Sequence, residues 1–480
     1  MFTFETGQGA MQSASALTYN SSGVDIDENQ KANRLIAEIV KGTIGHGVIS
    51  QPGFFSGAIS LGDLLHQNQN QSNLNYYSHS GESLRELQLP TSSSWFACLD
   101  YFASTPLKSD SVLKYVNSLA QFCKTHQISI LGGETAEMPG VIRKNSSEVI
   151  THIFGLGDPT PSQTISIANG FIYRGDSLNL RDLYSNHPDS NLVMSSDGVG
   201  TKTVLATKVN NLDCVIGDIL GHSQGDIACL GASGIGVCLY LGVHSDDLIG
   251  NRNNLIQRVD SICENYGLKL FELRVEIKPE VYEEGQIDLC GTIVGLVNQS
   301  DVLIGDRVET GQYCIGIPSS GLHTNGFSLV RRILESTDQA QAANLISDLL
   351  IPHQNYAEYV QKLIRTFSSS IKAIAHITGG GLPENLIRVL PENIEACLEW
   401  ESWAVPLIFQ QLQDIGQVPL YDPVNKGMLQ TFNMGIGLVV IVDKENYDSV
   451  SIFSQNFFNK DCPVIGITQN GNRGVKFNGL

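Results

Sequence analysis

One segment of this chain occurs twice, and the repeat limits the possible folds more than any other feature of the sequence. When Trp95–Gly157 is laid over Ile235–Val297 without a gap, Cys98 falls on Cys238, which fixes the offset at 140 residues. Identities at this offset also include Cys123 with Cys263, Pro139 with Pro279 and Gly155 with Gly295. The repeat predicts two units of the same fold within one chain.

The apolar residues of the two segments follow the same pattern. Val116, Leu119, Phe122, Ile128 and Ile130 fall on Ile256, Val259, Ile262, Leu268 and Leu270. This spacing predicts a helix followed by a strand in both copies. The stretches EVITHIFGLG and DLCGTIVGLV then predict the same closing strand.

The two copies have diverged in complementary ways. The first copy has GGETAEMPG at Gly132–Gly140, where the second has Glu272–Glu280. The second copy has SDGVGTK at Ser196–Lys202, where the same offset puts Ser56–Gly62 of the first. Each copy therefore retains a motif that the other has lost.

The SDGVGTK motif has the residues of an anion-binding loop. Gly198, Gly200 and Thr201 let backbone amides approach a phosphate, Asp197 offers oxygen to magnesium, and Lys202 supplies a positive charge. The spacing is not that of a Walker A loop. A simple connection from strand to turn is the alternative.

Asp218 and Asp226 are eight positions apart in a stretch with helical character. Two turns of a helix would put both carboxylates on similar faces, as candidate metal ligands. At the offset of 140, Asp226 faces Glu86. Solvated surface acids are the alternative.

The GGETAEMPG motif follows the apolar strand ISIL. A loop at that point, with Glu134 and Thr135, could hold a nucleotide. A tight turn would also explain the two glycines.

Two glycine-rich turns in the last third of the chain precede predicted helices. SSGLHTNGFSLVRRIL places Ser319, Ser320, His323 and Asn325 at a helix N-terminus, which favours anions, although His323 could be a capping residue. HITGGGLPENLIRVLP has Gly379, Gly380 and Gly381 before a helix with an early proline, and Asn385 within it. Three consecutive glycines favour close approach of a ligand to the backbone.

Composition excludes several classes of protein. The formal charge of −19 disfavours nucleic-acid binding. Apolar runs fall short of the roughly 20 residues that span a membrane, and the start of the chain lacks the pattern of a leader, so we expect a cytoplasmic protein. The ten cysteines are scattered, without zinc-ligand spacing.

Taken together, the motifs resemble those of aminoimidazole ribonucleotide (AIR) synthetase, the phosphoribosylformylglycinamidine cyclo-ligase family of purine biosynthesis. The resemblance rests on YNSSGVDID (Tyr19–Asp27), LDYFAST (Leu99–Thr105), GGETAEMPG, SDGVGTK, SSGLHTNGFSLVRRIL, HITGGGLPENLIRVLP and TFNMGIGLVVIV (Thr431–Val442). It covers most of the chain from Tyr19 to about Asn470, interrupted by Asn68–Ser94 and Pro159–Ser190, which we interpret as loops or as lineage-specific elaboration.

The resemblance implies an α/β (α+β) fold with two N-terminal-like domains paired into a pseudo-dimeric β-barrel and one C-terminal α/β domain. The implied divisions are 1–160 for the first repeat, 161–190 for a connector, 191–305 for the second repeat and 306–480 for the C-terminal domain. Internal pairing removes the usual reason to dimerise, so we expect a monomer.

The resemblance also implies an ATP- and Mg²⁺-dependent cyclisation of formylglycinamidine ribonucleotide at one composite site. Metal would bind Asp197, Asp226 and Asp218; ATP would contact Glu134, Thr135, Gly198, Gly200 and Thr201, and Lys202 its phosphates. His323 and Asn325 would act on the reacting amide or on the transferred phosphoryl group. Ser319, Ser320, Gly379, Gly380, Gly381 and Asn385 would contact the phosphoribosyl substrate. The symmetry-related second site would be inactive.

The sequence departs from the family pattern at two places. Asn20 stands where the family has lysine, and GMLQ at Gly427–Gln430 replaces the family's E-M-Y-R run. Another ATP-dependent enzyme of the superfamily and a non-catalytic nucleotide-binding scaffold are the alternatives.

Overall fold

The computed structural model describes residues 17–18, 22–23, 26–50, 53–84, 87, 89–422 and 424–480. Asn20, most of YNSSGVDID and Glu86 lie outside these ranges, so the predictions that concern them stay predictions. None of the helices described is long and apolar enough to cross a membrane.

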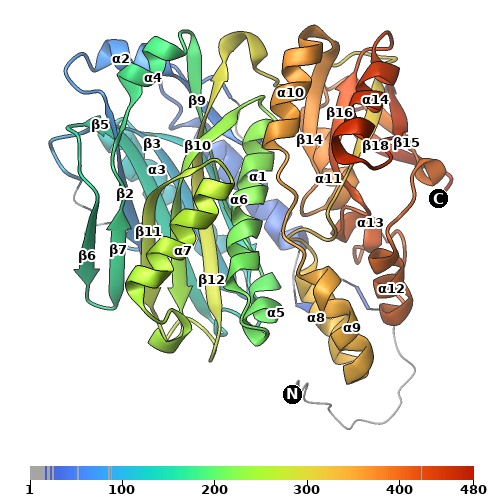
Figure 1. Ribbon diagram of the computed structural model, residues 1–480, viewed down its shortest axis with the longest axis horizontal. Coiled ribbons are helices and arrows are strands. Elements are labelled where there is room, and N and C mark those ends of the chain that lie inside the picture. The colour runs from blue at the N-terminus through green and yellow to red at the C-terminus, as the bar shows by residue number, and fades with distance from the viewer. Residues whose placement is uncertain are drawn as a thin grey trace.

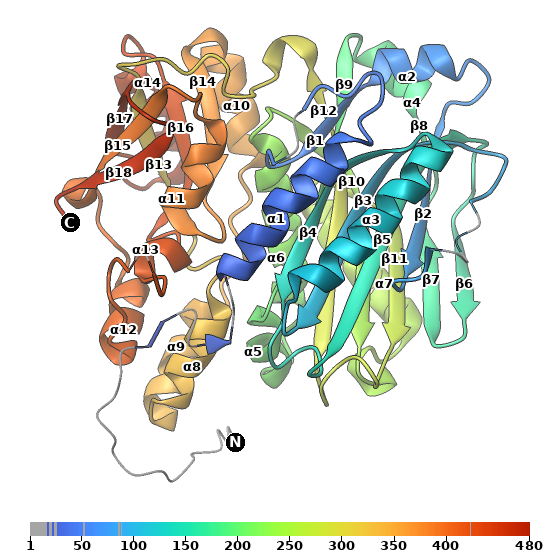
Figure 2. The same cartoon turned by 180° about the vertical axis from the view of Figure 1, so that it is seen from behind.

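The first third of the chain forms a mixed unit of helices and strands. Its elements are α1 (Ile26–Lys41), β1 (Gly57–Ser60), α2 (Leu61–Gln67), β2 (Asn73–Ser80), β3 (Ser94–Thr105), α3 (Ser109–His126), β4 (Ser129–Glu137) and β5 (Ser146–Gly157). Helices α1 and α3 lie together across one face of these strands (Figure 2). GGETAEMPG belongs mostly to strand β4, so the prediction of a loop was wrong for all but its last residues.

The second third has a similar order of elements. They are β6 (Gln163–Ile167), β7 (Gly170–Arg174), β8 (Leu178–Asn179), α4 (Leu180–Asn186), β9 (Ser190–Gly198), α5 (Lys202–Lys208), α6 (Leu212–Ala228), β10 (Ser233–Val243), α7 (Arg252–Asn265), β11 (Lys269–Ile277) and β12 (Ile287–Asn298). The helix and strand predicted in each copy are confirmed as α3 with β4 and α7 with β11.

The strands form two sheets that exchange their edge strands. One sheet has the order β1-β9-β12-β10-β11-β7-β6 and the other β4-β3-β5-β2-β8. Strand β1, from the first third, pairs with β9, and β8, from the second third, pairs with β2. The pairings of the described strands give two open sheets, so the expectation of one closed barrel is not met.

The two units also make reciprocal contacts. The Arg143 amide donates to the Val281 carbonyl (2.8 Å), and the Glu283 amide donates to the Val141 carbonyl (2.9 Å). Ile142 forms an antiparallel bridge with Tyr282, its counterpart at the offset of 140. Such reciprocity is the mark of an isologous, two-fold interface.

Side chains repeat this reciprocity. The Tyr101 hydroxyl donates to Asp288 (3.2 Å), and the Tyr240 hydroxyl donates to Glu148 (3.0 Å). On β3 and β10 the counterparts are 139 residues apart, because the β-bulge between Cys98 and Leu99 recurs between Val237 and Cys238. The ungapped alignment was therefore wrong by one residue for β3 and β10.

The predicted counterpart of SDGVGTK was wrong. Thr151 pairs with His79, and Gly291, its counterpart at the offset of 140, pairs with Asp197. His79 on β2 therefore occupies the position of Asp197, while Ser56–Gly62 supplies β1, which pairs with β9 itself. Only residues 81–93 connect β2 to β3, too few to form helices like α5 and α6.

Two segments interpreted as loops contain regular structure. Asn68–Ser94 includes β2, and Pro159–Ser190 includes β6, β7, β8 and α4. Their Asn- and Ser-rich composition misled the interpretation, because β6 and β8 lie at sheet edges, where polar residues are tolerated.

The last third forms a separate α/β unit around one sheet. Its elements are β13 (Tyr313–Pro318), α8 (Phe327–Glu335), α9 (Gln339–Leu349), α10 (Ala357–Phe367), β14 (Ile371–His376), α11 (Gly381–Leu386), β15 (Ile394–Glu399), α12 (Leu407–Gly416), α13 (Met428–Thr431), β16 (Ile436–Val442), α14 (Tyr447–Phe458), β17 (Val464–Asn470) and β18 (Gly474–Asn478). The strand order is β14-β16-β13-β17-β15-β18. Figure 1 shows this unit beside the two sheets, with α6 facing it.

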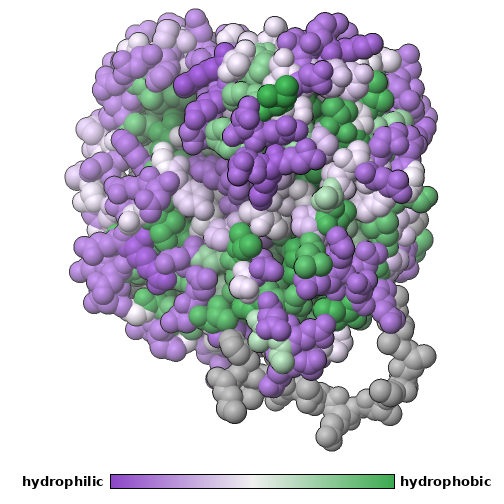
Figure 3. Space-filling model, turned by 45° about the vertical axis from the view of Figure 1, so that its right-hand side comes forward, coloured by the Kyte–Doolittle hydropathy of each residue, from purple (hydrophilic) through white to green (hydrophobic). Residues whose placement is uncertain are grey.

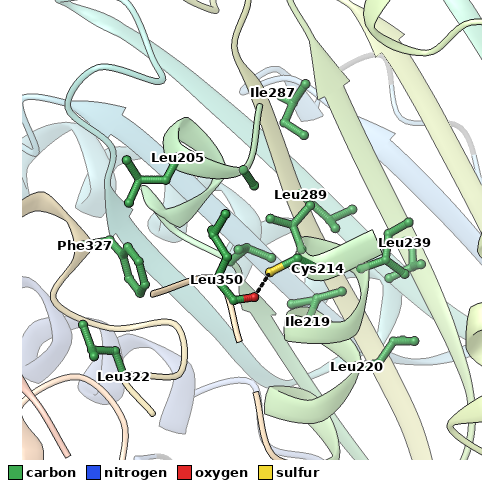
Figure 4. Packing of buried hydrophobic residues seen from close by; sticks show 14 of the residues in the cluster. Leu205, Cys214, Ile219, Leu220, Leu239, Ile287, Leu289, Leu322, Phe327 and Leu350 are labelled. Atoms are coloured by element: carbon green, nitrogen blue, oxygen red, sulfur yellow. Dashed lines mark hydrogen bonds between the residues drawn. The ribbon is translucent and has the colours of Figure 1, made fainter. Parts of the chain in front are cut away.

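A continuous apolar core joins this last unit to the second third of the chain. Leu205, Cys214 and Ile219 pack with Leu322 and Phe327 in one cluster (Figure 4). The Cys214 thiol donates to the Leu350 carbonyl at 2.9 Å. Full burial of each large apolar side chain contributes about 1.5–3 kcal/mol, so the two units hold each other in a fixed arrangement.

The outer surface of this junction has a different character. Figure 3 shows hydrophilic residues over most of the face where the C-terminal unit comes forward, with smaller hydrophobic groups between them.

Candidate active site

A cavity of about 880 Å³ lies where the two sheets meet the C-terminal unit. Its walls come from α1, β4, β9, α6 and the segments that lead into α8 and α11. The predicted site residues that line it are Glu134, Thr135, Asp197, Gly198, Gly200, Thr201, Asp226, Asn325, Gly379, Gly380 and Asn385. The structure thus brings together motifs as distant in the sequence as GGETAEMPG and HITGGGLPENLIRVLP, because β4 contacts β9 and the C-terminal unit covers them both.

SDGVGTK spans the end of a strand, a turn and the start of a helix. Strand β9 ends at Gly198, Gly200 has a φ of +75°, which favours glycine, and helix α5 begins at Lys202. Asp197 is the acidic residue of this strand, next to its last residue, and its carboxylate is partly exposed to the cavity. This turn brings the Asp197 carboxylate and the backbone of Gly198 to Thr201 to the same wall of the cavity.

Three carboxylates approach one another at the centre of the cavity. Burial and the negative charges of Asp197 and Asp226 raise the pKa of Glu134 well above its usual value. Burial alone would raise the pKa of Asp226, but His222 and His376 outweigh it and lower that pKa. This concentration of negative charge suits a cation.

His222 and His376 hold the Asp226 carboxylate. His376 Nδ1 lies 2.8 Å from Asp226 Oδ1, and His222 Nε2 lies 3.7 Å from Asp226 Oδ2 and 3.0 Å from Asp197 Oδ2. Burial lowers the pKa of His222, but the two aspartates outweigh it and raise the pKa to about 9. His353 Nε2 in turn contacts His376 Nε2 at 2.9 Å.

Sequence reasoning missed these three histidines and Arg388. His376 and Arg388 stand within the quoted HITGGGLPENLIRVLP motif, so the motif itself could have revealed them. His222, four residues before Asp226 on α6, could have been found from helical periodicity. His353 gave no local signal, because only the tertiary fold brings it to His376.

Arg388 fixes one rim of the cavity. Its guanidinium donates to the carbonyls of Gly53 (3.2 Å) and Phe54 (2.8 Å) and stacks over the Phe55 ring at 3.9 Å. The first third of the chain is thereby tied to the 3-10 helix Ile387–Val389, which directly follows α11.

Lys202 and Asp218 are not placed as predicted. Both side chains are fully buried, and Lys202 Nζ contacts Asp218 Oδ1 at 2.8 Å. The ammonium also donates to the carbonyls of His323 (3.1 Å) and Ile351 (2.8 Å), which uses all three of its protons. Neither side chain lines the cavity, so the phosphate and metal roles predicted for them are corrected to a structural ion pair.

Four other predicted residues also lie outside the cavity wall. The Ser319 hydroxyl donates to Gly321 O (2.9 Å), and the Ser320 hydroxyl donates to Pro352 O (2.8 Å). Gly381 packs against Leu429. His323 is buried, accepts from the Ser320 amide (3.2 Å) and stacks on His353 at 3.8 Å. They support the neighbouring loops rather than face the cavity.

Asn385 organises the glycine loop. Its amide nitrogen donates to the carbonyls of Gly379 and Gly381, both at 2.9 Å. The third residue of α11 is proline, as expected. The loop is therefore held open toward the cavity.

Comparison with known proteins identifies the family. The AIR synthase related protein N-terminal domain matches residues 180–297, and the corresponding C-terminal domain matches residues 309–477. The phosphoribosylformylglycinamidine cyclo-ligase of Desulfitobacterium hafniense is 36% identical over 297 residues, which cover 61% of this chain and 85% of the relative. That of Brevibacillus brevis is 34% identical over 300 residues, covering 60% and 83%.

Among solved structures, E. coli HypE, a hydrogenase maturation protein, aligns with a TM-score of 0.46 and 13% identity, over 63% of this chain and 86% of that one. The two family-model matches together span the second third of the chain and the C-terminal unit around the cavity. The chain therefore belongs to the AIR synthase family.

Proposed function

We propose that the chain uses ATP to cyclise formylglycinamidine ribonucleotide to aminoimidazole ribonucleotide, at one composite site. The observation that carries the proposal is the meeting of Glu134, from β4, with Asp197 and Asp226, from β9 and α6, in one cavity. The relatives at 36% and 34% identity carry the name of this cyclo-ligase.

The carboxylates fit a divalent cation. Burial, together with repulsion from Asp197 and Asp226, raises the pKa of Glu134, and a cation between the two aspartates would relieve the repulsion. Mg²⁺ would be held by Asp197 and Asp226 and would neutralise charge on the phosphates of ATP.

The cavity offers distinct ends for the two substrates. Near α1 it is lined by apolar Val40, Leu119 and Ile130 around the buried Asp100, whose pKa burial raises to about 7. A carboxyl that can take up a proton near neutral pH, set among apolar side chains, suits a purine base. The amides of Gly379 and Gly380, at the opposite wall, suit the ribose phosphate of the substrate.

The reaction needs the substrate amide between these two ends. ATP phosphorylates the formyl amide oxygen, the amidine nitrogen attacks that carbon, and phosphate leaves. Asn325 lines the wall between Thr201 and Gly379 and is positioned to orient the amide. The enclosing units exclude water from the activated intermediate.

We further propose that the first two thirds of the chain are a fused pair of N-terminal domains. The reciprocal contacts of Arg143 with Val281 and of Tyr101 with Asp288 support a pseudo-two-fold axis. The exchange of β1 and β8 between the sheets would be the internal form of a domain-swapped dimer.

The second position related by that axis is closed by ion pairs. Arg274 stands at the counterpart of Glu134 and pairs with Glu276. Lys278 contacts Glu148 at 2.7 Å and Glu276 at 2.9 Å. The second position has His79 where the first has Asp197, and the connection after β2 is too short for a helix like α6. It therefore lacks the aspartates of the first position.

The test is phosphate release with magnesium-ATP and formylglycinamidine ribonucleotide. Glu134→Gln and Asp197→Asn, from different units, should each lower kcat by about 100-fold or more, as loss of one electrostatic contact to a transition state does. His79→Asn, the matched control at the counterpart of Asp197, should retain turnover. Titration with a non-hydrolysable ATP analogue should give one site per chain.

Two sites per chain, or turnover that survives both substitutions, would contradict the composite site. A chain that binds the analogue and releases no phosphate with this substrate would point to another ATP-dependent reaction or to a scaffold.

A further inference from the structure

An imidazole nitrogen lies among the carboxylate oxygens expected to hold the metal. His222 Nε2 is 3.0 Å from Asp197 Oδ2 and 3.7 Å from Asp226 Oδ2, and the ring is 3% exposed. The other ring nitrogen, Nδ1, lies 3.0 Å from the Thr324 hydroxyl, which fixes the orientation of the ring. Metal-binding histidines are commonly oriented through their second nitrogen in this way.

Two carboxylate oxygens and one imidazole nitrogen converge at this point, and lone pairs on all three would repel one another. When Nε2 carries no proton, it and the two carboxylate oxygens repel. Asp226 cannot turn away easily, because its other oxygen is bound by His376 Nδ1 at 2.8 Å. Either a proton on Nε2 or a metal ion must satisfy this arrangement.

We propose that His222 Nε2 is a metal ligand together with Asp197 and Asp226, and that this centre prefers Mn²⁺ to Mg²⁺. Mg²⁺ takes oxygen ligands almost exclusively. Mn²⁺ also takes carboxylate oxygen, but it belongs to the first-row transition metals, whose affinity for sites with nitrogen donors follows the Irving–Williams order, so an imidazole donor favours Mn²⁺ over Mg²⁺. His376, His222 and Asp226 also form a group whose donor atoms all lie within 4.8 Å of one another.

A further acceptor on the same cavity wall lacks a partner. Within the described part of the chain, Asn325 Oδ1 is buried without a hydrogen-bond partner, and Asn325 follows Thr324, which orients His222. An unpaired buried oxygen is costly and favours a cation or a donor nearby.

This inference rests on the proposed function only in its choice of Asp197 and Asp226 as ligands. Its test is direct: Mn²⁺ is added to the whole chain, with and without a non-hydrolysable ATP analogue, and its electron spin echo modulation is recorded. We expect a ¹⁴N coupling from a directly bound imidazole, which disappears in His222→Gln.

Competition between the two metals gives a second readout. Because glutamine offers an amide oxygen, His222→Gln should lower the ratio of Mn²⁺ to Mg²⁺ affinity by about tenfold or more. His152→Gln, which removes a buried imidazole outside the cavity, should leave both the coupling and the ratio unchanged.

Bound Mn²⁺ without a ¹⁴N coupling, or no Mn²⁺ binding even with the nucleotide analogue, would overturn the inference. The two proposals fail separately. Turnover without nitrogen coordination would leave the cyclo-ligase standing, and nitrogen coordination without turnover would leave the metal centre standing.

Discussion

At the scale of single residues, the fate of Lys202 shows how a motif can be recognised and one of its members misassigned. The lysine of SDGVGTK was expected at a phosphate, but it lies in the core and joins α5 to the C-terminal unit through the carbonyls of His323 and Ile351. A charge this deeply buried contributes to stability only as long as its partner remains.

Lys202→Met should therefore destabilise the fold rather than weaken ATP binding alone. It leaves Asp218 buried without its cation, and the expected loss of unfolding free energy is about 3–5 kcal/mol, measured by urea denaturation. Lys202→Met combined with Asp218→Asn should recover much of that loss. The exposed pair Lys362–Glu358 is the control, and Lys362→Met should cost less than about 1 kcal/mol.

If Lys202→Met left the free energy of unfolding unchanged and greatly raised the KM for ATP, the structural role would be contradicted. Lys202 would then be assigned to the ATP phosphates again.

At the scale of elements, helix α6 fits against the C-terminal unit through small residues. Gly217, Gly221 and Gly225 recur every four residues and so lie along one face of the helix. A Cβ at Gly221 would stand 2.5 Å from the His353 carbonyl oxygen, and one at Gly225 would stand 2.5 Å from the His376 ring. This close approach allows His376 to reach Asp226.

Gly221→Ala should cost about 1–3 kcal/mol of unfolding free energy, because a backbone carbonyl has to move. Gly217→Ala is the matched control on the same face. Its nearest neighbour is the Tyr266 hydroxyl at 2.9 Å, a side-chain end that can shift, so the gain of about 1 kcal/mol in helix propensity offsets more of the strain. Equal thermal unfolding of the two variants would contradict this packing argument.

At the scale of the whole molecule, the first two thirds of the chain behave as two halves joined about an axis. His152 lies at this contact, with Nδ1 2.7 Å from the Thr292 hydroxyl, its own counterpart at the offset of 140. Burial, with a smaller contribution from Arg274, lowers the pKa of His152 from 6.5 to about 3.

The stability of the joined halves should fall in acid through this histidine. Between pH 6.5 and about 3 the unfolded chain takes up a proton that the folded chain refuses, so the unfolding free energy decreases as pH falls through that window. His152→Gln should reduce the loss, measured as the difference in urea stability between pH 7 and pH 5.

Asp100 and Asp288 act in the opposite direction, because burial raises the pKa of each to about 7 and the folded state then holds the extra proton. The variant and the wild type share these groups, so their difference isolates His152. Parallel pH profiles for the two chains would contradict the prediction.

The sequence by itself was enough to predict the local helices and strands and to identify most of the motifs that line the cavity. Helical spacing identified α3 and α7, and the glycine turns identified the segments before α8 and α11, because turns and amphipathic faces depend on neighbours in the chain. Eleven of the predicted site residues line the cavity.

Only the tertiary structure decided which side chains face that cavity. Asp218 and Asp226 lie on one helix, yet eight residues leave them about 80° apart, and Lys202 turns the first into the core. The histidines around Asp226 come from α6, β14 and the segment before α10, and no local pattern connects them.

The exchange of β1 and β8 was hidden for the same reason. These pairings join residues more than 100 positions apart. They are made by backbone hydrogen bonds, which produce no periodic pattern in the amino-acid sequence of either strand. The sequence fixes what each segment can become, while burial and long-range hydrogen bonding decide which segments meet.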